Sequence, residues 1–149
     1  MDKKKAAVGL SFFTSAGVLV YWILVFTGVF PVAEVIPGYT DWFMAFPLAD
    51  LWIAACALLA GIFLVKGRQL SVPFGIAAGS GLIFLGLYAL LYGINTGLLF
   101  IFTVDEVIEI AIKLYALSVG TFFIVYFWAI RDSLKSARPK SGARNSKHE

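Results

Sequence analysis

Residues 104–131, VDEVIEIAIKLYALSVGTFFIVYFWAIR, are the last of four long apolar stretches in this chain of 149 residues. At about 1.5 Å of rise per residue, a helix over this stretch is long enough to cross a hydrocarbon core of about 30 Å. The stretch contains Lys113, one helical turn after Glu109 and two turns after Glu106. An ionisable group within a membrane helix is costly, so Lys113 is a candidate functional residue.

The composition extends this interpretation to the whole chain. Hydrophobic residues make up 60% and charged residues 14% of the sequence, and the mean hydropathy is +0.89. Soluble domains contain about half apolar and about a quarter charged residues. We therefore expect an all-α polytopic membrane protein, a four-transmembrane-helix bundle in residues 1–132, followed by a basic, disordered cytoplasmic tail in 133–149. The predicted spans cover about 6–30, 48–65, 72–94 and 104–131.

Polar residues predict where two of these helices begin. Ser71 precedes Pro73 and is expected to cap the third helix. Thr103 and Glu106 have the spacing of a capping box, which predicts the start of the fourth helix. Trp42 to Phe46 could extend the second span as an interfacial segment. The largely apolar connection of residues 95–103 is expected to pack against the bundle or lie in the interface.

The basic residues predict the orientation. Apart from Lys113, they lie at the amino end, between the second and third spans, and in the tail: Lys3, Lys4, Lys5, Lys66, Arg68, Arg131, Lys135, Arg138, Lys140, Arg144 and Lys147. Four alternating spans place all of these on one side. Cytoplasmic loops are enriched in Lys and Arg, so the pattern predicts a multi-pass protein of the cell membrane with both termini cytoplasmic. This topology, together with the attraction of basic residues to anionic lipid headgroups, also explains the net charge of +3. A nucleic-acid partner is therefore not needed to explain it.

The counts of cysteine and histidine exclude several kinds of site. Cys56 is the single cysteine and His148 the single histidine. One cysteine cannot form an internal disulfide or a CxxC redox pair, and one terminal histidine cannot form a His-rich metal centre. We expect no metal and no cofactor.

Polar residues gather on the side opposite the bases. Glu109 and Lys113 stand in the favourable i, i+4 order, and Asp50 lies in the first turns of the second helix. If the helix faces converge, they form a polar cavity in the outward half of the bundle. The predicted ligand-binding residues are Asp50, Tyr88, Tyr92, Asn95, Glu106, Glu109 and Lys113, to which the first helix adds Ser11, Thr14, Ser15, Tyr21 and Thr27 as polar residues.

Each of these residues also has a structural interpretation. Asp50 could stabilise the start of its helix, the tyrosines could pack with satisfied hydroxyls, and Glu109 and Lys113 could be a structural ion pair. Trp42, Trp52, Tyr126 and Trp128 are expected to form interfacial belts. Gly75 and Gly79 form a GxxxG pair, which could serve a homodimer or ordinary packing within one bundle.

Three functions remain open from these residues. The first is binding of a small hydrophobic or lipid-like ligand, with Asp50 or Glu109 as candidate catalytic residues for proton transfer. The second is a non-catalytic accessory subunit of a larger membrane complex. The third is a small proton-coupled transporter, although transporters of the small multidrug type carry a carboxylate in helix one, which this chain lacks.

Residues 42–67, WFMAFPLADLWIAACALLAGIFLVKG, resemble the second-helix region of EXPERA-type membrane proteins, the group that includes the emopamil-binding sterol isomerase and the sigma-2 receptor. The shared features are an aromatic lead-in, the pair Asp50-Leu51, and the exit at Val65-Lys66-Gly67. The resemblance implies a four-helix bundle with cytoplasmic termini and a lipid-like ligand that Asp50 faces. The first helix lacks an acidic residue or histidine, and nothing matches the catalytic His and Glu set of the isomerase, so the resemblance does not extend to isomerase activity.

Overall fold

The structure is a computed structural model that describes residues 2–101 and 104–136. Within these ranges every regular element is a helix. Four are long: α1 (Lys3–Phe26), α3 (Pro47–Val65), α4 (Ser71–Thr96) and α5 (Val104–Ser136). Two are short: α2 (Tyr39–Phe43) and the 3-10 helix η1 (Leu98–Phe100). The four long helices are long and apolar enough to cross a membrane, α2 and α3 counting together, which confirms the all-α, four-span part of the prediction.

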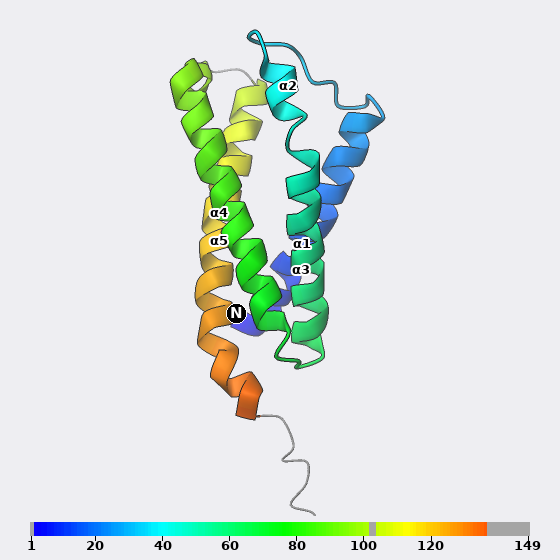
Figure 1. The fold of residues 1–149 in the computed structure, drawn as a ribbon, viewed down its shortest axis with the longest axis vertical. Coiled ribbons are helices and arrows are strands. Elements are labelled where there is room, and N and C mark those ends of the chain that lie inside the picture. The colour runs from blue at the N-terminus through cyan, green and yellow to red at the C-terminus, as the bar shows by residue number, and fades with distance from the viewer. Residues whose placement is uncertain (1, 102–103, 137–149) are drawn as a thin grey trace, which may run out of the picture.

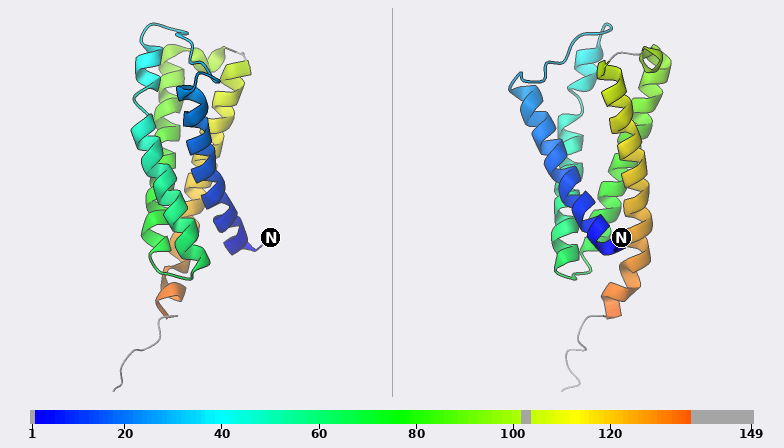
Figure 2. Two further views of the ribbon diagram at one scale, coloured as in Figure 1. Left: turned by 90° about the vertical axis from the view of Figure 1, so that its right-hand side faces the viewer. Right: turned by 180° about the vertical axis from the view of Figure 1, so that it is seen from behind.

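The long helices stand side by side along the long axis of the molecule (Figure 1). In chain order, α1 packs on α3, α3 on α4, and α4 on α5, whereas α1 and α5 touch only slightly. The start of α1, the turn between α3 and α4, and the end of α5 lie at one end, at the bottom of Figure 1. We call this the basic end, because Lys3, Lys66 and Arg131 belong to it. Residues 27–46 and η1 form the opposite, acidic end (Figures 1 and 2).

Helix α1 begins and ends earlier than the predicted span of 6–30. Asp2 caps it by accepting a hydrogen bond of 3.0 Å from the Lys4 N–H. At the other end, the Thr27 hydroxyl donates to the Ile23 carbonyl at 2.7 Å, and Gly28 has a left-handed φ of 74°. A glycine in this conformation is a common helix end, so the chain leaves α1 before Pro31 is reached.

Small residues bring α4 close to α5. A Cβ added at Gly75 would lie 2.1 Å from Phe127, and one added at Gly79 would lie 2.7 Å from the Gly120 carbonyl oxygen. The GxxxG pair of Gly75 and Gly79 therefore serves the packing of α4 on α5 within one chain. The close approach of α3 to α4 uses Gly81 instead, where a Cβ would meet Ile53 at 2.6 Å.

The predicted cap of the third helix was wrong. Ser71 is the first residue of α4 and not its cap: Leu70 holds the cap position, and the Ser71 hydroxyl is buried with no hydrogen-bond partner in the described part of the chain. Helix α5 continues through residues 133–136, because no proline interrupts it before Pro139. Thr103 of the predicted capping box and residues 137–149 lie outside the described residues.

Candidate functional site

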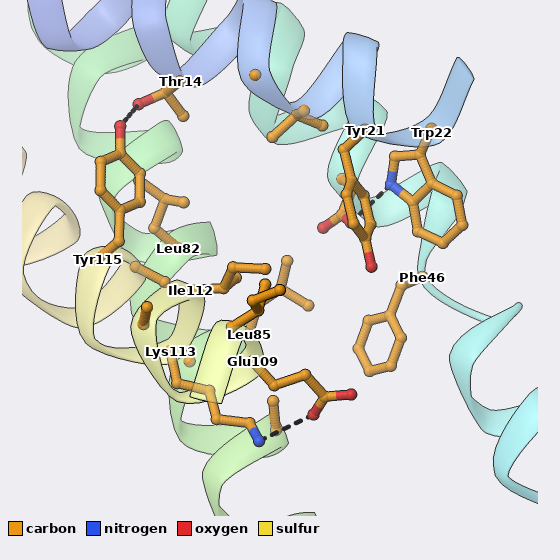
Figure 3. A pocket seen from close by; sticks show the side chains of 18 of the residues that line it. Thr14, Tyr21, Trp22, Phe46, Leu82, Leu85, Glu109, Ile112, Lys113 and Tyr115 are labelled. Carbon is orange, nitrogen blue, oxygen red and sulfur yellow. Dashed lines mark hydrogen bonds and ion pairs between the residues drawn. The ribbon is translucent and has the colours of Figure 1, made fainter. Parts of the chain in front are cut away.

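A cavity of about 600 Å³ lies in the half of the bundle toward the acidic end (Figure 3). All four long helices and α2 contribute to its wall. The volume falls within the range of about 300–1,000 Å³ that is typical of small-molecule sites. Most of the lining is apolar, with a few polar groups between aromatic and aliphatic side chains. The aromatic lining residues are Phe13, Tyr21, Trp22, Trp42, Phe43, Phe46 and Tyr115.

The cavity ends toward the basic end at a contact between α1 and α5. The hydroxyls of Thr14 and Tyr115 lie 2.7 Å apart and share a hydrogen bond (Figure 3). Phe13 packs edge-on against the Tyr115 ring, with 5.9 Å between the ring centroids. Beyond these residues the space is filled by the core, in which Phe123 and Phe127 are fully buried.

Asp50 places a carboxylate in the wall from the first turn of α3. The Trp22 indole N–H donates to its Oδ2 at 2.8 Å. Within the described residues Asp50 forms no ion pair, and its second oxygen receives no hydrogen bond. That oxygen is therefore able to accept a hydrogen bond from a molecule in the cavity.

Lys113 stands at the centre of a charged network on α5. Its ammonium lies 3.2 Å from Glu106 and 3.0 Å from Glu109. The second oxygen of Glu109 accepts a hydrogen bond from the Tyr39 hydroxyl, which connects α5 to α2. Lys113, Glu106 and Tyr39 are buried, whereas the Glu109 side chain is 30% exposed and, like Lys113, lines the cavity. A Cβ at Gly93 would lie 3.7 Å from the ammonium, so the lysine lies against the backbone of α4.

Helix α2 covers the cavity at the acidic end. Trp42 stacks on Tyr92 of α4 at 3.8 Å with an angle of 8° between the rings. Glu34 holds the start of α2 by accepting from the Gly38 N–H at 2.6 Å and the Thr40 N–H at 2.8 Å. The Thr40 hydroxyl, followed by these N–H groups, lowers the pKa of the Glu34 carboxyl below its ordinary value.

The structure brings together part of the predicted site. Asp50 of α3 lines one cavity together with Glu109 and Lys113 of α5, and the buried Glu106 forms an ion pair with the Lys113 ammonium. Figure 3 shows Tyr21 of α1 and Glu109 of α5 on facing sides of this space.

Three predicted residues, Tyr88, Tyr92 and Asn95, do not line the cavity. The face of α4 toward the cavity carries Leu82, Leu85, Gly86 and Ala89. At 3.6 residues per turn, the three polar residues lie about 70° to 130° around the helix axis from the centre of that face. Tyr92 packs behind Trp42, Tyr88 is 45% exposed, and Asn95 is exposed. These three residues therefore do not belong to the wall of this cavity, which is more apolar than expected.

The sequence missed several lining residues. Thr14 and Tyr21 stood out only as polar residues of the first helix, and Trp42 was expected in an interfacial belt. The contact of Trp22 with Asp50 has no local signal in the sequence, because it joins α1 to α3 and residues 27–46 separate the two helices along the chain. Trp52 and Trp128 are exposed, as belt residues would be.

No protein-family model, no curated protein and no solved structure matches the chain. The resemblance of residues 42–67 to EXPERA-type proteins therefore stays a prediction. Within the described residues, no group of three or more His, Cys, Asp or Glu side chains could hold a metal ion.

Proposed function

We propose that this chain is a multi-pass protein of the cell membrane, with both termini in the cytoplasm, that binds a small amphipathic, lipid-like molecule in the cavity. The observation that carries the proposal is the cavity itself, which has a volume of about 600 Å³ and a mainly apolar lining. It lies in a protein with four helices of membrane-spanning length. Such a space suits a hydrophobic body, and its few polar groups would orient one polar head.

The charges of the lining favour a particular kind of head group. Asp50 and Glu109 contribute two carboxylates, and Lys113 contributes one ammonium that Glu106 also binds. A carboxylate in a low-dielectric site is stabilised by a hydrogen-bond donor or a positive charge. The rings of Trp22 and Trp42 add faces that attract cations. A head that donates hydrogen bonds, an amine or a hydroxyl, therefore fits better than an anion.

The distribution of bases supports the orientation. The described Lys and Arg residues other than Lys113 lie at the basic end, and the cytoplasmic side of membrane proteins is enriched in such residues. The basic end is thus assigned to the cytoplasm, which places the cavity in the half of the bundle away from it.

Binding needs only the cavity, which Thr14, Tyr115 and the core close toward the basic end. Transport would in addition need a second state that opens toward that end. The roles of accessory subunit and proton-coupled transporter remain predictions from the sequence. Proton transfer by Asp50 or Glu109 is compatible with binding and would act on the bound head group.

Native mass spectrometry tests the binding proposal. The purified protein in lipid nanodiscs is offered tetradecylamine, tetradecanol or tetradecanoic acid, which share a chain and differ in the head. We expect the amine and the alcohol to be retained and the acid to be lost. If none of the three stays bound to intact, folded protein, the cavity is not a site for amphiphiles of this kind.

A further inference from the structure

The exposed lining residues of the cavity all belong to two helices. On α1 these are Phe13, which is 64% exposed, and Gly17. On α5 they are Ala111, Ile108, which is 42% exposed, and Ile112, which is 47% exposed. The lining residues on α2, α3, α4 and the connection between α2 and α3 are all buried or half-buried. The open side of the cavity is therefore the gap between α1 and α5, which we call the α1–α5 seam (Phe13, Gly17, Ile108, Ala111 and Ile112).

The seam lies at the depth of the acyl chains. Helices α1 and α5 diverge toward the acidic end, as the right-hand view of Figure 2 shows, and they are joined by Thr14 and Tyr115. Thr14 lies about 18 Å below the acidic end of α1, and Tyr115 about 16 Å below that of α5, at about 1.5 Å per residue. The junction is thus near the middle of a hydrocarbon core of about 30 Å, and the seam extends from this depth toward the acidic end.

A ligand could alternatively enter from the water at the acidic end, but α2 blocks this route. Trp42 of α2 stacks on Tyr92 of α4, and Tyr39 of α2 is hydrogen-bonded to Glu109 of α5. These two contacts hold α2 over the cavity from both sides. A water-soluble ligand would have to displace α2, whereas a molecule in the bilayer would meet exposed apolar side chains at the seam.

We propose that the ligand reaches the cavity sideways from the hydrocarbon core, through the α1–α5 seam, and is therefore a molecule dissolved in the bilayer. This inference rests on the proposed binding function and adds the source and the path of the ligand. The Thr14–Tyr115 hydrogen bond sets how far the seam extends toward the basic end.

The quenching of tryptophan fluorescence by a brominated ligand can distinguish access to the cavity from binding in it. The parent is Trp52→Phe with Trp128→Phe, which removes two exposed tryptophans and keeps Trp22 and Trp42 in the cavity wall. Reconstituted in phosphatidylcholine vesicles, it is mixed with a brominated tetradecylamine, whose bromine quenches tryptophan fluorescence on contact. The amplitude of quenching reports occupancy, and its rate reports access.

Three substitutions in this parent test the path. Ala111→Phe enlarges a side chain of the seam, and Leu114→Phe is its matched control, because Leu114 is 60% exposed on the same helix but does not line the cavity. Tyr39→Phe removes the hydrogen bond from the Tyr39 hydroxyl to Glu109, and so weakens the attachment of α2 to α5. We expect Ala111→Phe to slow quenching about tenfold and the other two to leave the rate unchanged.

The opposite pattern overturns the seam as the path. If Tyr39→Phe speeds quenching while Ala111→Phe has the rate of Leu114→Phe, the ligand passes α2 from the water. That result would leave the binding function intact, since the amplitude persists. Loss of all quenching in the parent would instead remove the binding function, and the seam with it.

Discussion

At the scale of single residues, the charge of Asp50 can be removed with little change in shape. An asparagine side-chain oxygen can still accept the hydrogen bond from Trp22, so Asp50→Asn should keep the contact between α1 and α3. The charge that favours an amine head is lost. We expect the retention of tetradecylamine relative to tetradecanol to fall about tenfold, since a charge-assisted hydrogen bond contributes about 1.5–3 kcal/mol. An unchanged ratio in native mass spectrometry would show that Asp50 does not contact the head group.

The two ion pairs of Lys113 lead us to expect that it stabilises the fold, a question that its position in the sequence alone left open. Its removal leaves Glu106 and Glu109 buried or half-buried without the ammonium that neutralises them. Breaking a buried pair on one side costs about 3–5 kcal/mol, so we expect Lys113→Met to lower the melting temperature sharply in detergent. Replacing both glutamates by glutamine in the same variant should restore part of it. If Lys113→Met melts like the parent protein but no longer retains tetradecylamine, the lysine serves binding and not the fold.

At the scale of elements, α2 depends on an exposed carboxylate. The pKa of Glu34 is lowered in the folded protein, so its support of α2 is present above the ordinary pKa of glutamate and is lost as the pH falls through the lowered value. We expect hydrogen exchange at residues 38–44, corrected for the intrinsic rate, to accelerate over that acidic range.

A pair of variants separates this contact from general charge effects. Glu34→Gln should accelerate exchange at residues 38–44 already at neutral pH, because the acceptor of the Gly38 and Thr40 N–H groups is weakened. Asp41→Asn removes an equal charge from α2 without removing either hydrogen bond. Equal exchange in the two variants would mean that Glu34 does not hold α2 in place.

The same element shows how far the sequence could predict the site. Helix spans follow from length and composition, and the Glu109–Lys113 pair follows from local spacing. The rotation of α4 depends on Gly75 and Gly79 meeting α5, which is a long-range fit. The position of Trp42 in front of Tyr92 depends on α2, a separate short helix where the sequence suggested an interfacial extension of the second span. The tyrosines were therefore assigned to a cavity that they do not reach.

At the scale of the whole molecule, the orientation can be tested by cysteine labelling. Replacing the buried Cys56 by alanine gives a background without thiols. Val35→Cys probes the acidic end and Arg68→Cys the basic end, both at exposed positions. We expect a membrane-impermeant maleimide to label Val35→Cys in intact cells, and Arg68→Cys only after permeabilisation, because bases are retained on the cytoplasmic side. The reverse pattern would place the cavity in the cytoplasmic half.

The central claim is that the cavity holds the ligand, and two glycines of α1 offer a matched test of it. A Cβ at Gly17 or at Gly9 would meet nothing within 4 Å, and only Gly17 lines the cavity. Gly17→Phe and Gly9→Phe therefore make the same change in one helix, inside and outside the site. In native mass spectrometry of the nanodisc-embedded protein, we expect Gly17→Phe to lose most of the bound tetradecylamine while Gly9→Phe retains it. Equal retention by the two variants would contradict binding in this cavity.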